Sequence, residues 1–117
     1  MAYIDGFVLP VPRDNKEAYL ALAKEVSTIF REFGALNVME CWGTDVPDGE
    51  VTSLPMAVKY AEDETVVFSW ITWPSREARD AGHAKFTADP RMEKMMGAMP
   101  FDGKRMIFGG FEVILDA

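Results

Sequence analysis

Thr65-Val-Val-Phe-Ser-Trp-Ile-Thr-Trp73 is the stretch that decides the fold of this chain. Its density of β-branched and aromatic residues predicts a β-strand. Both faces of that strand are apolar, with Val67, Ile71 and Trp73 on one face and Val66, Phe68 and Trp70 on the other. A strand with one face in water would alternate with polar residues, so we expect the sheet that contains it to be covered on both sides.

Upstream of that strand, the sequence predicts a strand, a helix and a second strand. Tyr3–Pro12 is the first strand, and its two prolines lack the N–H that a ladder needs, so its far end is expected at a sheet edge or outside the sheet. Asp14 is expected to begin the helix, with Glu17 three residues later as in a capping box. The helix carries one apolar stripe, and Gly34 is a suitable terminator. Leu36–Gly43 follows as the next strand.

Residues 44–63 are rich in Asp, Gly, Glu and Pro and are long for a structureless connection. We expect a short element near Met56–Tyr60, and a functional loop is the alternative. After the aromatic strand, Ser75 is expected to cap a helix over Arg76–Ala88. Asp89-Pro90 predicts the start of a further short helix, with the cap first and proline in the first helical position.

The last predicted element is a strand over Met106–Leu115, which follows a turn at Pro100–Lys104. Gly109-Gly110 inside this strand indicates a bulge or a close approach by another backbone. The order of elements is therefore β-α-β-β-α-β, which is the ferredoxin-like arrangement with a four-stranded antiparallel sheet. The fold class is α+β, and residues 1–117 are expected to form a single domain.

The apolar character of both sheet faces predicts a homodimer. Two helices on one side of the sheet cover only one face, and a bare apolar face of this size is rare on a monomer. A second copy related by two-fold symmetry is the simplest cover. The candidate interface residues are Trp70, Phe108 and Phe111. Because Phe108 and Phe111 fall on opposite faces of the last strand, the sequence leaves open which face meets the partner.

Composition narrows the functional classes. The chain has 117 residues and a formal net charge of −7, which opposes a nucleic-acid backbone, so no nucleic-acid partner is expected. No apolar run approaches the roughly 20 residues of a membrane span, and no secretory signal is evident, so we expect no membrane partner. The single cysteine, Cys41, excludes an internal disulfide, and a cytoplasmic location fits this set of features.

Several short motifs are similar to those of a known family. They are Asp5-Gly6-Phe7-Val8, Glu40-Cys41-Trp42-Gly43, Phe68-Ser69-Trp70-Ile71, Trp73-Pro74-Ser75, Asp89-Pro90-Arg91-Met92, Met99-Pro100-Phe101-Asp102-Gly103-Lys104-Arg105-Met106-Ile107 and Gly109-Gly110-Phe111. Together they cover nearly the whole chain, which resembles the YbaA-like bacterial family, the domain of unknown function 1428. The resemblance implies the dimeric α/β-barrel superfamily, in which two ferredoxin-like sheets pack face to face. That superfamily contains monooxygenases, other enzymes and binding modules, so the fold does not determine the function.

Glu40 and Trp42 are the first candidate site residues. On a strand they share one face, while Cys41 points to the other. A carboxylate beside an indole on a buried face is expected to have a raised pKa, which suits a general acid or base. The alternative is a strand-end glutamate paired with an arginine, with the tryptophan in the core. Cys41 is expected to be a small buried hydrophobic residue, without a neighbour that would make it a thiolate.

His83, the only histidine, is the second candidate. Arg79 and Asp80 precede it by four and three residues on the same helix face, so a hydrogen bond from the ring N–H to the Asp80 carboxylate would orient the ring. His83 is then a proton-transfer residue, or it belongs to an ordinary solvated helix face. One histidine does not supply a multi-histidine metal site, so neither a metal nor a cofactor is predicted.

Asp102, Lys104 and Arg105 form the third candidate site. Asp102 followed by glycine is ordinary turn chemistry, whereas the two basic residues are the densest positive charge in an acidic chain. Arg105 is suited to hold a carboxylate or phosphate through its planar guanidinium group, and a purely structural role is the alternative. Methionines at helical spacing, from Met92 to Met99, are expected to form adaptable core or to line a ligand site.

Three functions are compatible with these observations. The first is a homodimeric protein that binds a small molecule, or acts as an accessory protein, without turnover. The second is a cofactor-free enzyme, similar to a monooxygenase or an isomerase, acting on a small aromatic or polar substrate. In that case Glu40 is the base, His83 the proton shuttle and Arg105 the anion clamp. The third is a structural or regulatory dimer without a ligand.

Overall fold

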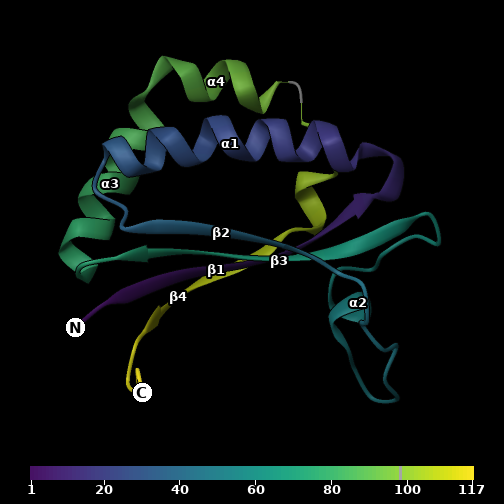
Figure 1. Ribbon diagram of the computed structural model, residues 1–117. Helices are drawn as coiled ribbons and strands as arrows, with labels where there is room; N and C mark the ends of the chain where they lie inside the picture. The colour runs from purple at the N-terminus through teal and green to yellow at the C-terminus, as the bar shows by residue number, and fades with distance from the viewer. Residues whose placement is uncertain (98) are drawn as a thin grey trace.

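The computed structural model describes residues 1–97 and 99–117, which form a helical layer over one antiparallel sheet (Figure 1). The strands are β1 (Tyr3–Pro12), β2 (Asn37–Trp42), β3 (Glu64–Trp73) and β4 (Ile107–Glu112). The α-helices are α1 (Lys16–Glu32), α2 (Leu54–Ala57), α3 (Arg76–Ala88) and α4 (Pro90–Met96). Two 3-10 turns cover Arg13–Asn15 and Gly103–Arg105. The predicted α+β class and the β-α-β-β-α-β order are confirmed. The short helix expected after Asp89-Pro90 is α4, and the short element expected near Met56–Tyr60 is α2, which begins earlier, at Leu54.

The sheet has the strand order β2-β3-β1-β4, so the two central strands are β1 and β3. They pair along their whole length, from Tyr3 opposite Trp73 to Pro12 opposite Glu64. The edge strand β4 pairs only with the first half of β1, ending where Val8 lies opposite Ile107. Pro10 and Pro12 of β1 therefore lie beyond the end of β4. On the β4 side of β1 there is no strand at these positions that would need a hydrogen bond from the N–H that proline lacks.

One face of the sheet packs against α1 and α3, and the hydrophobic core lies between them (Figure 1). Trp73 is completely buried, and the ring of Phe30 from α1 meets it edge to face at 6.1 Å. Phe86 from α3 stacks on the same Phe30 ring at 4.0 Å. These aromatic contacts fix the two helices to the sheet at the end where β3 finishes.

Most of the predicted helix boundaries are confirmed by their capping contacts. The hydroxyl of Ser75 accepts a hydrogen bond from the N–H of Ala78, and Asp89 accepts one from Arg91. Gly34 follows α1 with a φ of 111°, in the region that favours glycine. The expected capping box at Asp14 is wrong, because a 3-10 turn occupies residues 13–15 and no side chain caps α1.

Two expectations for the last strand are also wrong. The strand ends at Glu112, not at Leu115, because only Met1 and Ala2 precede β1, and the last backbone contact along this edge is the hydrogen bond from the N–H of Val113 to the carbonyl of Ala2. Gly109 and Gly110 form no bulge, since the register with β1 is continuous through both residues. A Cβ atom at Gly110 would instead meet Nη2 of Arg79 and the ring of Tyr3, so the close neighbours of this glycine are side chains and not another backbone.

The other face of the sheet, which we call the outer face, is turned away from the helices (Figure 1). The pairing register places six large apolar residues on it: Ile4, Met39, Phe68, Trp70, Ile107 and Phe111. Phe111 is 60 % exposed and Phe68 is 46 % exposed. The sequence therefore predicted two apolar faces correctly, and in the isolated chain only one of them is covered.

None of the helices in the described part of the chain has the length and apolar character that a membrane-spanning helix requires.

Candidate functional site

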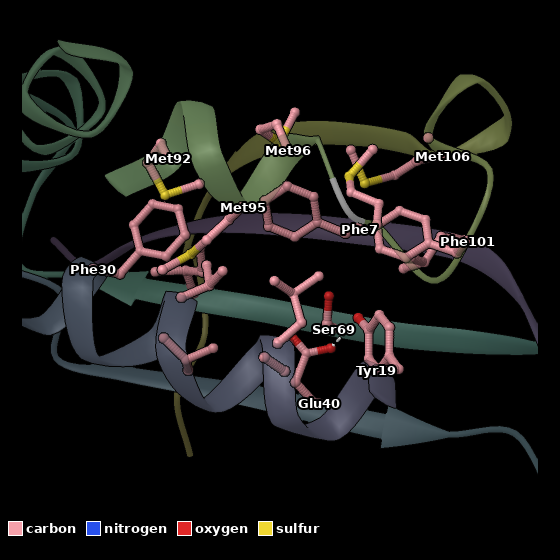
Figure 2. A pocket seen from close by; sticks show the side chains of 18 of the residues that line it. Phe7, Tyr19, Phe30, Glu40, Ser69, Met92, Met95, Met96, Phe101 and Met106 are labelled. Atoms are coloured by element: carbon pink, nitrogen blue, oxygen red, sulfur yellow. Dashed lines mark hydrogen bonds between the residues drawn. The ribbon is translucent and has the colours of Figure 1, made fainter. Parts of the chain in front are cut away.

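A cavity of about 590 Å³ lies between the sheet and the helices α1 and α4 (Figure 2). Its size is within the range of small-molecule sites. Its walls are almost entirely apolar, with side chains from α1, α3, α4, three strands and the segment that leads into β4. The apolar lining includes Phe7, Leu9, Leu22, Ala23, Val26, Phe30, Val38, Ile71, Phe86, Met92, Met95, Met96, Met99, Phe101 and Met106.

The methionines predicted as core or ligand box line one wall of this cavity. Met92 and Met95 come from α4, and Met106 lies just before β4 (Figure 2). Methionine is unbranched and polarisable, so a wall made of it adapts its shape to what it contacts. Met92 is buried, whereas Met96 is 58 % exposed at the outer end of the helix. The cavity thus has a wall that can adjust to a ligand.

Glu40 is the main polar group inside the cavity, and its partner is Tyr19 of α1. The Tyr19 hydroxyl donates a hydrogen bond of 2.5 Å to Oε1 of Glu40 (Figure 2). Glu40 is exposed when the whole residue is considered, but its carboxylate lies against the apolar walls of the cavity. This desolvation raises the pKa of Glu40, and the hydrogen bond from Tyr19 opposes the rise. Burial and the neighbouring carboxylate also raise the pKa of Tyr19, so its hydroxyl remains protonated.

Ser69 lies beside Glu40 and completes the polar part of the cavity floor. The two residues are opposite each other in the β2–β3 register, and both line the cavity. The hydroxyl of the buried Ser69 points into the cavity (Figure 2). Glu40, Tyr19 and Ser69 therefore form one small hydrogen-bonding patch in an apolar cavity, which is the usual arrangement of a ligand-binding site.

The basic segment near residue 104 contributes to the cavity only in part. Asp102 and Lys104 line the rim, whereas Arg105 points away and binds Glu64 through two hydrogen bonds of 2.7 Å. Arg105 also donates to Asp102 and to the carbonyl of Lys59. These hydrogen bonds lower the pKa of Glu64 and raise that of Arg105. Most donors of Arg105 are used within the protein, which favours the structural alternative for this residue.

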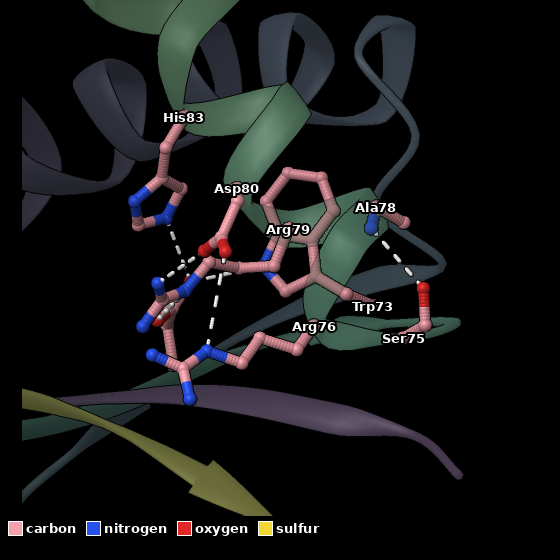
Figure 3. Close-up of polar contacts among 8 residues, drawn as sticks. Trp73, Ser75, Arg76, Ala78, Arg79, Asp80 and His83 are labelled. Carbon is pink, nitrogen blue, oxygen red and sulfur yellow. Dashed lines mark hydrogen bonds and ion pairs between the residues drawn. The ribbon is translucent and has the colours of Figure 1, made fainter.

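His83 lies outside the cavity lining, and its partner is not the one expected from the helix spacing. Its Nε2 is 2.7 Å from Oδ2 of Asp5, a residue of β1, and Asp80 instead accepts a hydrogen bond from Arg79 (Figure 3). Asp5 is 4 % exposed and also accepts hydrogen bonds from Trp73 Nε1 at 2.9 Å and Arg79 Nε at 3.0 Å. We call these four residues, Asp5, Trp73, Arg79 and His83, the Asp5 cluster.

The remaining candidates lie apart from the cavity. Trp42 shares the helix-side face with Glu40, as the alternation predicts, but it is half-buried beneath Lys16, whose Nζ is 5.5 Å from the ring centroid. Cys41 lies on the outer face as a half-buried free thiol. In the described chain no group of three or more His, Cys, Asp or Glu side chains has the arrangement of a metal site.

The structure therefore does not assemble Glu40, His83 and Arg105 into one active site. Only Glu40 contributes to the cavity, because His83 is bound to Asp5 and Arg105 to Glu64. Sequence reasoning missed Tyr19 and Ser69 as site residues. Tyr19 is part of the apolar stripe of α1, and its hydroxyl was the one signal that it would seek a polar partner.

Comparison with known proteins is consistent with this fold. Residues 2–103 match the family model described as protein of unknown function (DUF1428). The chain is 58 % identical over 116 residues to the uncharacterised protein YbaA of Escherichia coli K12, covering 99 % of both chains, and equally to YbaA of Shigella flexneri. The structure of Rv0793 from Mycobacterium tuberculosis shares the fold with a TM-score of 0.55 and 14 % identity, covering 100 % of this chain and 99 % of that one. The chain therefore belongs to the DUF1428 family.

Proposed function

We propose that this protein binds a small, mainly apolar molecule in the cavity between the sheet and helices α1 and α4. The observation that carries the proposal is the cavity itself, which has about 590 Å³ of space, apolar walls and a single hydrogen-bonding patch at Glu40, Tyr19 and Ser69. An apolar pocket with a few convergent polar groups and a carboxylate of raised pKa is the usual form of a binding site.

Filling the cavity is expected to abolish binding without disturbing the fold. Ala23 lines the cavity from α1, so Ala23→Phe places a ring in the space that a ligand would occupy. The neutral fluorescent probe N-phenyl-1-naphthylamine is expected to bind the wild-type protein, with at least about tenfold weaker binding to the variant, a change of about 1.4 kcal/mol. Fluorescence titration measures the affinity, and circular dichroism reports the fold.

Ala21→Phe is the matched control, because Ala21 is exposed on the same helix and does not line the cavity. It adds the same ring to the same helix and is expected to leave the affinity for the probe unchanged. Equal affinity of all three proteins for the probe would contradict the proposal, since the probe would then bind elsewhere on the molecule.

We also propose that the protein works as a homodimer whose two outer faces pack on each other. The support is the row of exposed apolar side chains on that face, which includes Phe68, Ile107 and Phe111. Stable interfaces bury roughly 800 Å² on each partner, and aromatic residues are enriched at their centres. Phe108 of the same strand turns to the helix side, where its ring is 6.3 Å from that of Phe7, so we place it outside the centre of the proposed interface.

A charge on the outer face is expected to dissociate the dimer. Phe111→Asp would bury an unpaired carboxylate between two apolar sheets, so we expect the dissociation constant to rise at least about tenfold. Phe108→Asp places the same charge on the opposite face of β4 and is expected to leave the dimer intact. Sedimentation equilibrium measures both. Dissociation by Phe108→Asp but not by Phe111→Asp would instead indicate an interface on the other side of the strand.

A further inference from the structure

We propose that the cavity selects a flat aromatic alcohol, whose hydroxyl group donates a hydrogen bond to the Glu40 carboxylate and accepts one from Ser69. This inference rests on the proposed function of the same cavity and adds the chemical class of the ligand. It is carried by three observations: the aromatic and thioether character of the walls, the arrangement of the polar groups on the floor, and the sign of the charge inside the cavity.

The walls favour an aromatic body. Phe30 and Phe86 already stack at 4.0 Å at one end of the cavity, and Phe101 meets Tyr19 edge to face at 5.7 Å at the other. An aromatic ring gains energy from both stacked and edge-to-face contacts, and the sulfur atoms of the methionine wall make favourable contacts with ring edges. A flat aromatic ligand between these two ends would therefore contact aromatic rings at both ends and methionine sulfur atoms along the wall.

The floor favours a hydroxyl group. Tyr19 has one hydroxyl hydrogen and donates it to Oε1 of Glu40, which leaves Oε2 of the carboxylate to accept from a ligand. Ser69 lies opposite Glu40 in the register of the two strands, so its hydroxyl and the carboxylate lie next to each other on the cavity floor (Figure 2). A ligand group at this position must donate a hydrogen bond to Glu40 and accept one from Ser69. A hydroxyl group does both.

The carboxylate of Glu40 disfavours an anionic ligand, and the apolar walls disfavour a cationic one. A ligand carboxylate would meet the carboxylate of Glu40, and among the lining residues that the structure describes the sole cation is Lys104, at the rim. An ammonium group would bring three N–H donors to a place with few acceptors, and it would lose its hydration against apolar walls. A neutral ligand avoids both penalties.

Four bicyclic probes with the same ring system test this inference: naphthalene, 2-naphthol, 2-methoxynaphthalene and 2-naphthoate. Each is titrated against the wild-type protein by displacement of N-phenyl-1-naphthylamine. We expect 2-naphthol to bind at least about tenfold more tightly than 2-methoxynaphthalene, because the ether accepts but does not donate to the carboxylate. We expect 2-naphthoate to bind more weakly than naphthalene, since its charge opposes that of Glu40.

The double variant Tyr19→Phe, Glu40→Leu links the selectivity to the polar patch. It removes both partners of the hydrogen bond, so no buried donor remains unpaired. We expect it to bind naphthalene as well as the wild type does, and to lose the preference for 2-naphthol over 2-methoxynaphthalene. Glu25→Leu, on the exposed side of α1, is the control and is expected to retain that preference.

The outcomes separate the two proposals. If naphthalene displaces the fluorescent probe but 2-naphthol and 2-methoxynaphthalene bind equally to the wild type, the aromatic-alcohol inference is wrong and the binding function stands. If the double variant keeps the full preference for 2-naphthol, the inference is also wrong, because the hydroxyl is then recognised elsewhere. If neither the fluorescent probe nor naphthalene binds, the proposed function itself fails.

Discussion

Replacing Asp5 with alanine is expected to lower the free energy of unfolding by about 3–5 kcal/mol. Asp5 is the buried acceptor at the centre of the Asp5 cluster, and its removal leaves three donors without a partner. The indole N–H of the completely buried Trp73 has no route to water, and the guanidinium group of Arg79 is only 19 % exposed. A buried donor without a partner is among the costliest defects in a protein interior, and the charge of Arg79 would keep only the half-exposed Asp80 as its partner.

Asp80→Ala is the matched control for this experiment. Asp80 also binds Arg79, at 2.7 Å, but its side chain is 55 % exposed, so we expect its removal to cost less than about 1 kcal/mol. Urea denaturation measures both variants at one protein concentration, because the stability of the proposed dimer would depend on concentration. Similar stability losses for Asp5→Ala and Asp80→Ala would show that the burial of Asp5 does not determine its contribution.

Gly82→Ala is expected to destabilise the protein by about 1–3 kcal/mol, although alanine is the better helix former. Helix propensity alone favours alanine over glycine by about 1 kcal/mol. At Gly82, however, the added methyl carbon would overlap Cζ3 of the Trp73 ring and lie 3.1 Å from the carbonyl oxygen of Phe33. Trp73 is completely buried and bound to Asp5, so it has little freedom to move, and overpacking outweighs propensity.

Gly97→Ala tests the same substitution where space is available. The nearest atom to a methyl group at Gly97 is the carbonyl oxygen of Lys94 at 3.6 Å, an ordinary contact distance. We expect this variant to keep or slightly raise the wild-type stability, as measured by thermal unfolding followed by circular dichroism. A Gly82→Ala variant at least as stable as Gly97→Ala would refute the close packing of α3 on Trp73.

The fold was predictable because its signals are local. The β-branched and aromatic run of β3, the cap at Ser75 and the positive φ of Gly34 each depend on neighbouring residues. The helix start at Asp14 was not predictable in this way. The chain first makes a 3-10 turn after Pro12, and this shifts the beginning of α1 beyond the capping pattern.

The candidate site was predictable only in part, because its contacts are made between distant segments. The raised pKa of Glu40 was correctly expected from the sequence. In the alternative interpretation the partner of its carboxylate was an arginine, whereas the structure has the hydroxyl of Tyr19 from α1 there. His83 has Asp80 in reach along its own helix, yet it binds Asp5, 78 residues away. Helix spacing identifies only the neighbours of His83 on its own helix. It does not reveal a carboxylate on a facing strand that is more deeply buried than Asp80.

The strand order has a consequence for the kinetics of folding. β1 lies at the centre of the sheet, but both of its partners come from the second half of the chain, and Tyr3 pairs with Trp73 on one side and Glu112 on the other. During synthesis, β1 therefore stays without a partner until β3 has been made, while α1 can form at once from local contacts. Such distant pairings close large loops before any contact stabilises them, so we expect this sheet to fold more slowly than a helical bundle of the same size.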